Sequence, residues 1–495
     1  MKICLVRPCS FTDYYVSYPL NIECLMAALN SEGHKVTFID AELYASEKIN
    51  LELRGIRHKI KGIWDAKYWA RKNSEIVKSF FMASSELWNE ISESIINENP
   101  DMIGLSCYTA SMSSVKRIAR AVKKSGFSGS IVAGGIHPTV QPIETLQNIP
   151  ELDVLVVGEG EETIKELASA LDRGHDKLKE VAGIYYRDKN SGDILKTKHR
   201  SLIEDLEDLP ILEWKFSSPD YYNYIILTSR GCPFDCTFCA PKNIWGKTVR
   251  FRPAHHVVKE TQNLVTKTNT RKIRFGDDTF TLRKSHMEKI FSGLKKAGIE
   301  DVRLTVGSRI DTIDPEKLKL MRDYVYHISF GIESGSQRIT DYNRKRIKTS
   351  DTVPTIKNTN ENGFETTTYF ILNHPTETDS DIKQTLKVMK ALKSCSKNII
   401  WINIGFPYPG TPWWDYCKNN KLLGGIDFYN KSHTYNHFFT PKVNMTAIDD
   451  NSLRHYLDMG ERIEKSNNNK VRARQLIRHF INDPKFYYRR LISKI

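Results

Sequence analysis

The sequence predicts an α/β protein with two successive parallel sheets and a small α-rich C-terminal region. Three observations lead to this fold class. Short apolar runs alternate with helix-like periodicity over residues 1–195, the alternation resumes over 220–425, and an acidic stretch ending in a proline, 203–210, separates the two. Such alternation is typical of strand–helix units in a parallel sheet. We therefore expect domains at 1–195 and 220–425, a linker at 196–219 and a C-terminal region at 426–495.

The first domain is expected to be Rossmann-like, with strands at 2–6, 33–40, 101–108, 130–135 and 153–157. Residues 41–98 are polar, contain Trp and Lys, and predict a helical insertion. An open parallel sheet binds ligands beyond the carboxyl ends of its strands, where glycines allow close approach. Candidate contacts to a large flat or nucleotide-like ligand follow the last three strands: Tyr108, Thr109, Gly134, Gly135, His137, Thr139, Gly158, Glu159 and Gly160.

The second domain is expected to form a partial TIM-like barrel, (β/α)6. Its strands are predicted at 224–228, 272–276, 302–306, 327–332, 367–372 and 399–404. The active site of such a barrel lies at the C-terminal ends of the strands. There, Asp277 or Asp278 could accept from the ammonium of a zwitterionic amino acid, and Arg309 could bind its carboxylate. Glu333 could take an ammonium or a ribose, although each residue could instead cap a helix or form a salt bridge.

Three cysteines follow the first barrel strand in a CxxxCxxC spacing: Cys232, Cys236 and Cys239. They can hold three irons of a 4Fe-4S cluster. Clusters that serve electron transfer usually have four cysteines, so the open iron favours an enzyme that binds a small molecule there. A zinc knuckle would need a nearby fourth ligand, and His255 and His256 lie too far along the chain. The nine cysteines are odd in number and scattered, which argues against disulfides.

The barrel motifs resemble those of radical S-adenosylmethionine (SAM) enzymes over roughly residues 220–415. The resemblance rests on the cysteine loop with Phe238 before its last cysteine, and on Gly276-Asp-Asp278, Gly331-Ile-Glu-Ser-Gly335 and Tyr408-Pro-Gly-Thr-Pro412. One motif departs from the family. Asn373-His-Pro-Thr-Glu-Thr378 stands where Gly-x-Pro-Gly-Glu-Thr is common, which puts in question how closely the backbone approaches SAM there.

The N-terminal loops Gly134-Gly-x-His-x-Thr139 and Gly158-Glu-Gly-Glu161 resemble the cobalamin-binding domain that precedes such barrels in class B methyltransferase-like members. The Asp-x-His-x-x-Gly motif that supplies a cobalt-ligating histidine in many cobalamin proteins is absent. The resemblance therefore implies cobalamin with its own base displaced and no protein histidine on cobalt. His137 is expected to be a loop residue.

The resemblance also implies a set of site residues. The cluster would be held by Cys232, Cys236 and Cys239, and the strand-end residues of the first domain would contact cobalamin. SAM would be contacted by Phe238, Gly276, Asp277, Asp278, Ser308, Arg309 and Glu333. No catalytic side chain is assigned beyond the cluster. The expected reaction is reductive cleavage of SAM to a 5'-deoxyadenosyl radical, followed by C-methylation of an unactivated carbon in a small-molecule, natural-product or lipid substrate.

Three alternatives remain open at this point. Within the family, a cobalamin-dependent cyclisation or rearrangement without methyl transfer would resemble the anaerobic porphyrin ester cyclases. RNA methylthiolation would need three further patterned cysteines in the first domain, and Cys4, Cys9, Cys24 and Cys107 lack such a pattern. A non-catalytic cobalamin sensor would not cleave SAM.

Charge and hydropathy set expectations for partners and location. The net charge is +14, and residues 461–495 carry ten Lys or Arg against three Asp or Glu. This basic amphipathic tail predicts a helix packed on the body, with contact to an anionic membrane surface as an alternative and no nucleic acid expected. No apolar run is long enough to span a membrane. We expect a cytoplasmic enzyme, or one peripheral at the inner membrane face, that receives electrons from a flavodoxin or ferredoxin.

Overall fold

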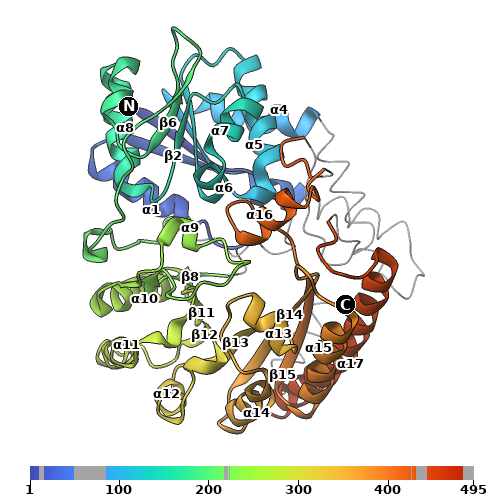
Figure 1. Ribbon diagram of the computed structural model, residues 1–495. Helices are drawn as coiled ribbons and strands as arrows, with labels where there is room; N and C mark the ends of the chain where they lie inside the picture. The colour runs from blue at the N-terminus through green and yellow to red at the C-terminus, as the bar shows by residue number, and fades with distance from the viewer. Residues whose placement is uncertain are drawn as a thin grey trace, which may run out of the picture.

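The computed structural model describes residues 1–10, 16–48, 85–216, 221, 223–424, 426–430 and 443–482, with side chains to Val471 in the last range. Two sheets made largely of parallel strands follow one another along the chain. In Figure 1 the N-terminal sheet, blue to green, lies above the barrel, green to orange, and the last helix runs beside the barrel. The predicted α/β class and the order of its two units are confirmed.

The N-terminal sheet has seven strands in the order β2-β1-β3-β4-β5-β6-β7. The first five pair in parallel and the last two are antiparallel. The order reverses between β1 and β3, a point where open sheets bind ligands. The strands are β1 (Lys2–Arg7), β2 (Lys35–Asp40), β3 (Met102–Ser106), β4 (Ser130–Gly134), β5 (Val154–Val156), β6 (Ile184–Arg187) and β7 (Ile194–Lys196).

Helices cover both faces of this sheet. On one face, α1 (Leu20–Ser31) and α8 (Glu161–Arg173) bury apolar side chains that include Ile22, Leu29 and Leu167. On the other, α4 (Ser85–Asn97) and α5 (Met112–Lys124) do the same, and the short helices α6 (Ile136–Val140) and α7 (Pro142–Asn148) follow β4. Burial on both faces explains why these strands are nearly continuous apolar runs.

Helix α4 lies inside the segment 41–98 that the sequence suggested as an insertion. Its residues Leu87, Trp88, Ile91 and Ile95 recur at helical spacing and are buried against the sheet. A parallel connection from β2 to β3 needs a crossover over one face, and α4 provides part of it, together with the helical residues 41–48. The helix is therefore part of the sheet domain. Its polar outer face explains why the sequence pattern predicts a surface insertion. Residues 49–84 of the expected insertion lie outside the described residues.

The segment between the sheets packs along the barrel. It contains the short helix η3 (Leu206–Asp208), and Leu206, Leu212 and Trp214 are buried. The backbone N–H of Leu212 donates to Glu260 Oε1 at 3.1 Å, and Trp214 Nε1 donates to the Glu260 carbonyl at 3.0 Å. These contacts fix the segment against the first barrel helix.

The barrel sheet has six parallel strands in the order β8-β11-β12-β13-β14-β15, as expected for a partial barrel. The strands are β8 (Ile225–Ile226), β11 (Lys272–Phe275), β12 (Arg303–Ser308), β13 (Val325–Glu333), β14 (Glu365–Leu372) and β15 (Asn398–Ile404). The helices are α10 (Ala254–Thr268), α11 (Lys284–Lys296), α12 (Pro315–Met321), α13 (Gln337–Tyr342), α14 (Thr352–Glu361), α15 (Asp379–Ala391) and α16 (Pro412–Asn419). A two-stranded ribbon, β9 (Ser229–Arg230) with β10 (Arg250–Phe251), frames the cysteine loop and α9 (Lys242–Trp245).

A long helix, α17 (Asp450–Asn482), covers the edge strand β15. Asn468 accepts from the Ile400 N–H at 2.9 Å and donates to the Ile400 carbonyl at 2.7 Å, and Asn467 donates to the Asn398 carbonyl at 2.7 Å. An edge strand otherwise presents unpaired backbone groups, and here helix side chains pair with them. The first part of the basic tail is thus packed on the barrel, and residues 483–495 lie outside the described residues.

Among the described helices, none combines the length and apolar character that crossing a membrane requires.

Candidate cofactor site

The cysteine loop, residues 231–241, leaves β9 through a turn that only glycine fits. Gly231 has φ +97°, and an added Cβ would lie 2.2 Å from the Thr248 carbonyl oxygen. Further along, Thr237 Oγ1 donates to Asn343 Oδ1 at 2.8 Å and its N–H donates to the Asn343 carbonyl at 3.1 Å. Trp413 Nε1 also donates to Asn343 Oδ1, at 2.9 Å. The loop is therefore held between the end of α13 and the start of α16.

The three cysteine side chains suit a metal cluster. Cys236 is buried, and Cys232 and Cys239 are partly buried. Burial, with the nearby charges of Asp278 and the other two thiols, raises the pKa of Cys239 to about 12, and burial likewise raises the pKa of Cys232. Thiolates in this loop therefore need a cationic partner, which bound iron supplies.

The spacing of the thiols favours a multinuclear centre over a single ion. Within the part of the chain that the structure describes, the three sulfurs do not all lie within 4.8 Å of one another, and no fourth ligand joins them in such a group. A tetrahedral zinc with bonds near 2.3 Å would draw its sulfur ligands to within about 3.8 Å of each other. The donor set, three thiols on one short loop, fits a 4Fe-4S cluster with one iron open.

The two predicted aspartates after β11 have different environments. Asp277 is buried and accepts from the Thr228 N–H at 2.7 Å, Thr228 Oγ1 at 2.5 Å and Ser229 Oγ at 2.7 Å. Its carboxylate thus fastens the strand end that leads into the cysteine loop. Asp278 is exposed, and no described residue bonds to its carboxylate. Although the residue as a whole is exposed, partial desolvation of its carboxyl, together with the charge of Asp277, raises the pKa of Asp278 to about 6. Of the pair, Asp278 is free to accept from an ammonium group.

Arg309, predicted to bind a carboxylate, lies against the cysteine loop. Its guanidinium stacks 3.6 Å from the ring centre of Phe234, and Nη1 lies 4.0 Å from Cys236 Sγ. Nη2 donates to Asp311 at 2.8 Å and to the Lys345 carbonyl at 2.6 Å. These bonds hold the guanidinium in place and leave Nη1 directed at the cluster region.

The other predicted SAM contacts line the same strand ends. Glu333 ends β13 with φ +67° and accepts from Lys345 Nζ at 2.7 Å, so its carboxylate is already paired. Ser308 bonds to Thr281 Oγ1 at 2.5 Å, and the Phe238 ring packs 5.6 Å from Trp413. Gly276 has no room for a side chain, since an added Cβ would lie 2.5 Å from Ile225.

The motif that departs from the family keeps a glycine-like backbone. Asn373 and Thr376, at the two usual glycine positions, have φ +75° and +63°. Asn373 Nδ2 donates to the carbonyls of Gly405 at 2.9 Å and Val443 at 2.8 Å, and its Oδ1 accepts from the Met445 N–H at 2.9 Å. The left-handed conformation costs free energy for residues with a Cβ, and these bonds offset it. Both positions therefore keep a backbone conformation that glycine adopts freely.

The N-terminal loops are closely joined. Gly135 has φ +121°, and an added Cβ would lie 2.4 Å from the Cys107 carbonyl oxygen. Thr139 Oγ1 donates to the Gly135 carbonyl at 2.7 Å and accepts from the Gly158 N–H at 3.1 Å, so it links two predicted loops. Tyr108 is 50% exposed at the end of β3. An exposed aromatic beside tight glycine turns suits a large planar ligand.

His137 is fully buried in α6. Its Nδ1 lies 3.1 Å from Thr109 Oγ1 and its Nε2 lies 3.0 Å from the Tyr429 hydroxyl, so both ring nitrogens are engaged. Burial lowers the pKa of His137 to about 3, and the ring is neutral. Both nitrogens thus have partners, and the residue lies in a short helix and not in the loop where it was expected.

Glu159 was expected to contact a ligand, but its carboxylate pairs with buried arginines. It accepts from Arg230 Nη1 and Arg250 Nη1, each at 2.8 Å, and from the Ile203 N–H at 2.7 Å. Glu161 accepts from Arg230 Nη2 at 2.5 Å. The four charged side chains are at most 9% exposed. We call Glu159, Glu161, Arg230 and Arg250 the interdomain ion-pair network, because it joins the β5–α8 loop of the first domain to the strand that opens the cysteine loop.

Sequence reasoning placed Glu159 toward a ligand and did not single out either arginine. The available signal was that Arg230 directly precedes Gly231-Cys232.

The two predicted cofactor regions face each other across the domain junction. Helix α6, which follows β4, contacts α9, which follows the cysteine loop. Asn243 Nδ2 of α9 donates to the Gly410 carbonyl at 3.0 Å. Figure 1 shows α6, α9 and α16 gathered at this junction. The carboxyl ends of strands from both sheets therefore meet here.

Family comparisons agree with this arrangement. The model of the Radical SAM superfamily matches residues 226–389, and that of the B12 binding domain matches 74–168, a range that includes α4. An uncharacterised methyltransferase of Pyrococcus horikoshii is 32% identical over 349 residues, 69% of this chain and 74% of the relative. An anaerobic magnesium-protoporphyrin IX monomethyl ester cyclase of Rubrivivax gelatinosus is 28% identical over 382 residues, 74% of this chain and 66% of the relative.

Solved structures show the same fold. The radical SAM methyltransferase TsrM from Kitasatospora setae, with cobalamin and a 4Fe-4S cluster bound, has a TM-score of 0.65 at 16% identity and covers 86% of this chain and 76% of its own. The cobalamin-dependent radical SAM enzyme OxsB with aqua-cobalamin has a TM-score of 0.62 at 20% identity, over 85% of this chain and 55% of its own. The chain therefore belongs to the cobalamin-binding, methyltransferase-like family of radical SAM enzymes, whose cofactors are a 4Fe-4S cluster, SAM and cobalamin.

Proposed function

We propose that this enzyme transfers a methyl group to an unactivated carbon of a small-molecule or lipid substrate. The supporting observation is the junction itself: the cysteine loop and the β3, β4 and β5 loops face each other, and the interdomain ion-pair network joins them. A substrate between the two regions would meet both cofactors. The name of the Pyrococcus horikoshii relative, a methyltransferase, favours the same reaction type.

In this proposal, different residues of the chain bind SAM and cobalamin. Asp278 accepts from the ammonium of SAM, because its carboxylate has no other described partner, and Arg309 Nη1 attracts the carboxylate. Tyr108, which is half exposed, and the Gly135 and Gly158 turns would hold the cobalamin. The bound cofactors supply radical and methyl-transfer chemistry that no side chain provides. The protein positions the target carbon and excludes other hydrogen donors.

An anaerobic assay tests the proposal. The reconstituted enzyme, with cobalamin, SAM and a flavodoxin or ferredoxin reductant, is incubated with fractionated extract of its native cells. The expected products are 5'-deoxyadenosine and a compound heavier than its precursor by one methylene unit. Cys236→Ala should abolish both, and Cys395→Ala, a buried cysteine outside the loop, should retain both. Formation of 5'-deoxyadenosine with no methylated product would contradict methyl transfer.

A second reaction, ring closure without methyl transfer, is favoured by the similarity to the magnesium-protoporphyrin ester cyclase. The match covers 66% of the length of that relative. In the same assay, cyclisation would give a product that lacks the added methylene, with 5'-deoxyadenosine still formed.

A further inference from the structure

Glu207, His255 and His256 form a cluster of possible ligands on the outside of the barrel, which we call the His–Glu cluster. One ligand atom from each lies within 4.8 Å of the other two. Glu207 is on η3, in the segment between the domains, whereas the histidines occupy the first turn of α10. His255 Nε2 lies 3.5 Å from Glu207 Oε1, and the two imidazole rings are 4.6 Å apart in an edge-to-face arrangement.

The environment of His256 independently points to a missing partner. The residue is only 8% exposed, and its Nδ1 is buried with no hydrogen-bond partner among the described residues. A buried polar atom without a partner is costly, and such atoms in native proteins usually meet water, an ion or another group.

We propose that the His–Glu cluster binds one divalent transition-metal ion of the zinc, nickel or copper class. Two imidazoles and a carboxylate are the donors that these ions prefer, and water can complete the coordination. Bonds near 2.1 Å bring tetrahedral ligands to about 3.4 Å from one another, so ligand atoms that now lie within 4.8 Å need to close by at most about 1.4 Å. Glu207 and His255 are exposed and can make this change by side-chain rotation.

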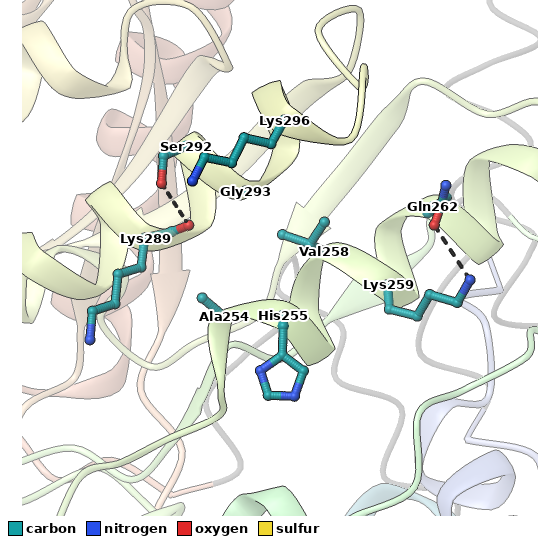
Figure 2. Close-up of a pocket in the computed structure, with 9 residues that line it drawn as sticks. All are labelled: Ala254, His255, Val258, Lys259, Gln262, Lys289, Ser292, Gly293 and Lys296. Carbon is teal, nitrogen blue, oxygen red and sulfur yellow. Dashed lines mark hydrogen bonds between the residues drawn. The ribbon is translucent and has the colours of Figure 1, made fainter.

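The cluster is accessible from solvent. Figure 2 shows His255 extending from the first turn of α10, away from the α11 side chains, at the margin of a surface pocket of about 390 Å³ between these helices. None of the predicted cofactor residues lines this pocket. The proposed ion is therefore separate from the iron–sulfur cluster and the cobalamin.

A bound ion would fasten the interdomain segment to the barrel. Nearby, Glu260 of α10 already accepts from the Leu212 N–H and pairs with Arg252 at 2.6 Å. Ile203, on the other side of Glu207, is held by Glu159 of the first domain. The ion would add a link between these two attachments, and it would bind only the folded chain because its ligands come from separate segments.

Zinc titration of the tag-free, full-length enzyme tests this proposal. The cluster is reconstituted first, so that iron occupies the cysteine loop, and binding is followed by calorimetry. We expect one Zn²⁺ per chain. Changes outside the ligand sphere already cost metal sites about tenfold or more in affinity, so His255→Ala and Glu207→Gln should each weaken binding by at least about tenfold. Both residues are exposed, and both variants should fold.

His455→Ala, which removes an exposed histidine of α17, is the matched control and should bind Zn²⁺ as wild type does. Cobalt provides a second readout: Co²⁺ in the His–Glu cluster should give visible bands without thiolate charge transfer. Three results would overturn the proposal: no saturable Zn²⁺ binding, unchanged affinity in both variants, or a cobalt spectrum dominated by thiolate bands. Unchanged affinity would reduce the 3.5 Å contact between His255 and Glu207 to an ordinary surface ion pair.

Discussion

The interdomain ion-pair network gives the sharpest stability prediction. Glu159→Gln keeps the shape of the side chain but removes the charge that Arg230 and Arg250 share at 2.8 Å each. The Glu159 side chain is 2% exposed, so water cannot replace the lost interaction. Breaking a buried ion pair from one side costs about 3–5 kcal/mol, because the remaining charge is left uncompensated. Glu161 still pairs with Arg230, so we expect a loss of about 3 kcal/mol.

The assay is urea unfolding of the full chain, followed by tryptophan fluorescence, at neutral pH. Glu162→Gln is the control, because Glu162 lies nearby in the first turn of α8 and pairs with Lys165 at the surface, where a pair contributes about 0–1 kcal/mol. Burial opposes ionisation of Glu159, but its arginine partners hold its pKa below the usual range. The charge therefore stabilises the fold above the ordinary glutamate pKa, and this contribution is lost as the pH falls through the lowered value.

A second measurement distinguishes positioning from stability alone. If the network sets the spacing of the two cofactor regions, Glu159→Gln should form more 5'-deoxyadenosine per product than wild type under conditions where both are folded. A variant within about 1 kcal/mol of wild type, with unchanged product coupling, would refute the reasoning.

Three further predictions follow from single positions. Asp278→Asn should weaken SAM binding, measured by equilibrium dialysis. It should also stabilise the apoprotein at pH 8 but not at pH 4. The reason is that a carboxyl with a raised pKa destabilises the fold progressively as the pH rises from the ordinary aspartate pKa to about 6. Thr376→Gly should raise the free energy of unfolding by about 1 kcal/mol, because glycine adopts a positive φ without the cost that a Cβ brings. Asn373→Gly should lower the free energy of unfolding, because three hydrogen bonds of the Asn373 side chain are lost. Gly135→Ala should abolish the cobalamin absorbance of the reconstituted enzyme, because the added Cβ would meet the Cys107 carbonyl at 2.4 Å; retention of full cobalamin would show that this turn lies away from the ligand.

The parallel strands were predictable from sequence because burial on both faces leaves apolar runs that differ from the flanking helices. The antiparallel strands β6 and β7 at the end of the first sheet were not among the strands expected. The first barrel strand was an exception in length: residues 224–228 were expected, and β8 covers Ile225–Ile226. The backbone beyond it turns to meet Asp277 and to pair with β10, and neither contact is visible in a local pattern. Helix α4 lies within the helical insertion that was expected, but its place on the face of the sheet was not predicted, because its outer face is polar.

The motifs of the candidate site could be recognised in the sequence. Which of their residues are structural and which are open to a ligand could not. Asp277 and Asp278 are adjacent and chemically identical, and only burial separates a structural carboxylate from an open one. Glu159 meets Arg230 and Arg250 across 71 and 91 residues of chain, a distance that no spacing rule spans. The departure at Asn373 suggested a change in loop shape, yet Asn373 keeps a positive φ, and its side chain bonds to residues 443 and 445.

The asparagines of α17 also limit how this barrel can grow or associate. Asn467 and Asn468 bond to the backbone of β15 at Asn398 and Ile400, positions where an added strand would pair. A seventh strand, whether inserted in the same chain or offered by another molecule, would first have to displace the helix. The helix thus ends the strand-to-strand hydrogen bonding at β15. It protects this edge of the open barrel from edge-to-edge polymerisation, although the barrel stays open.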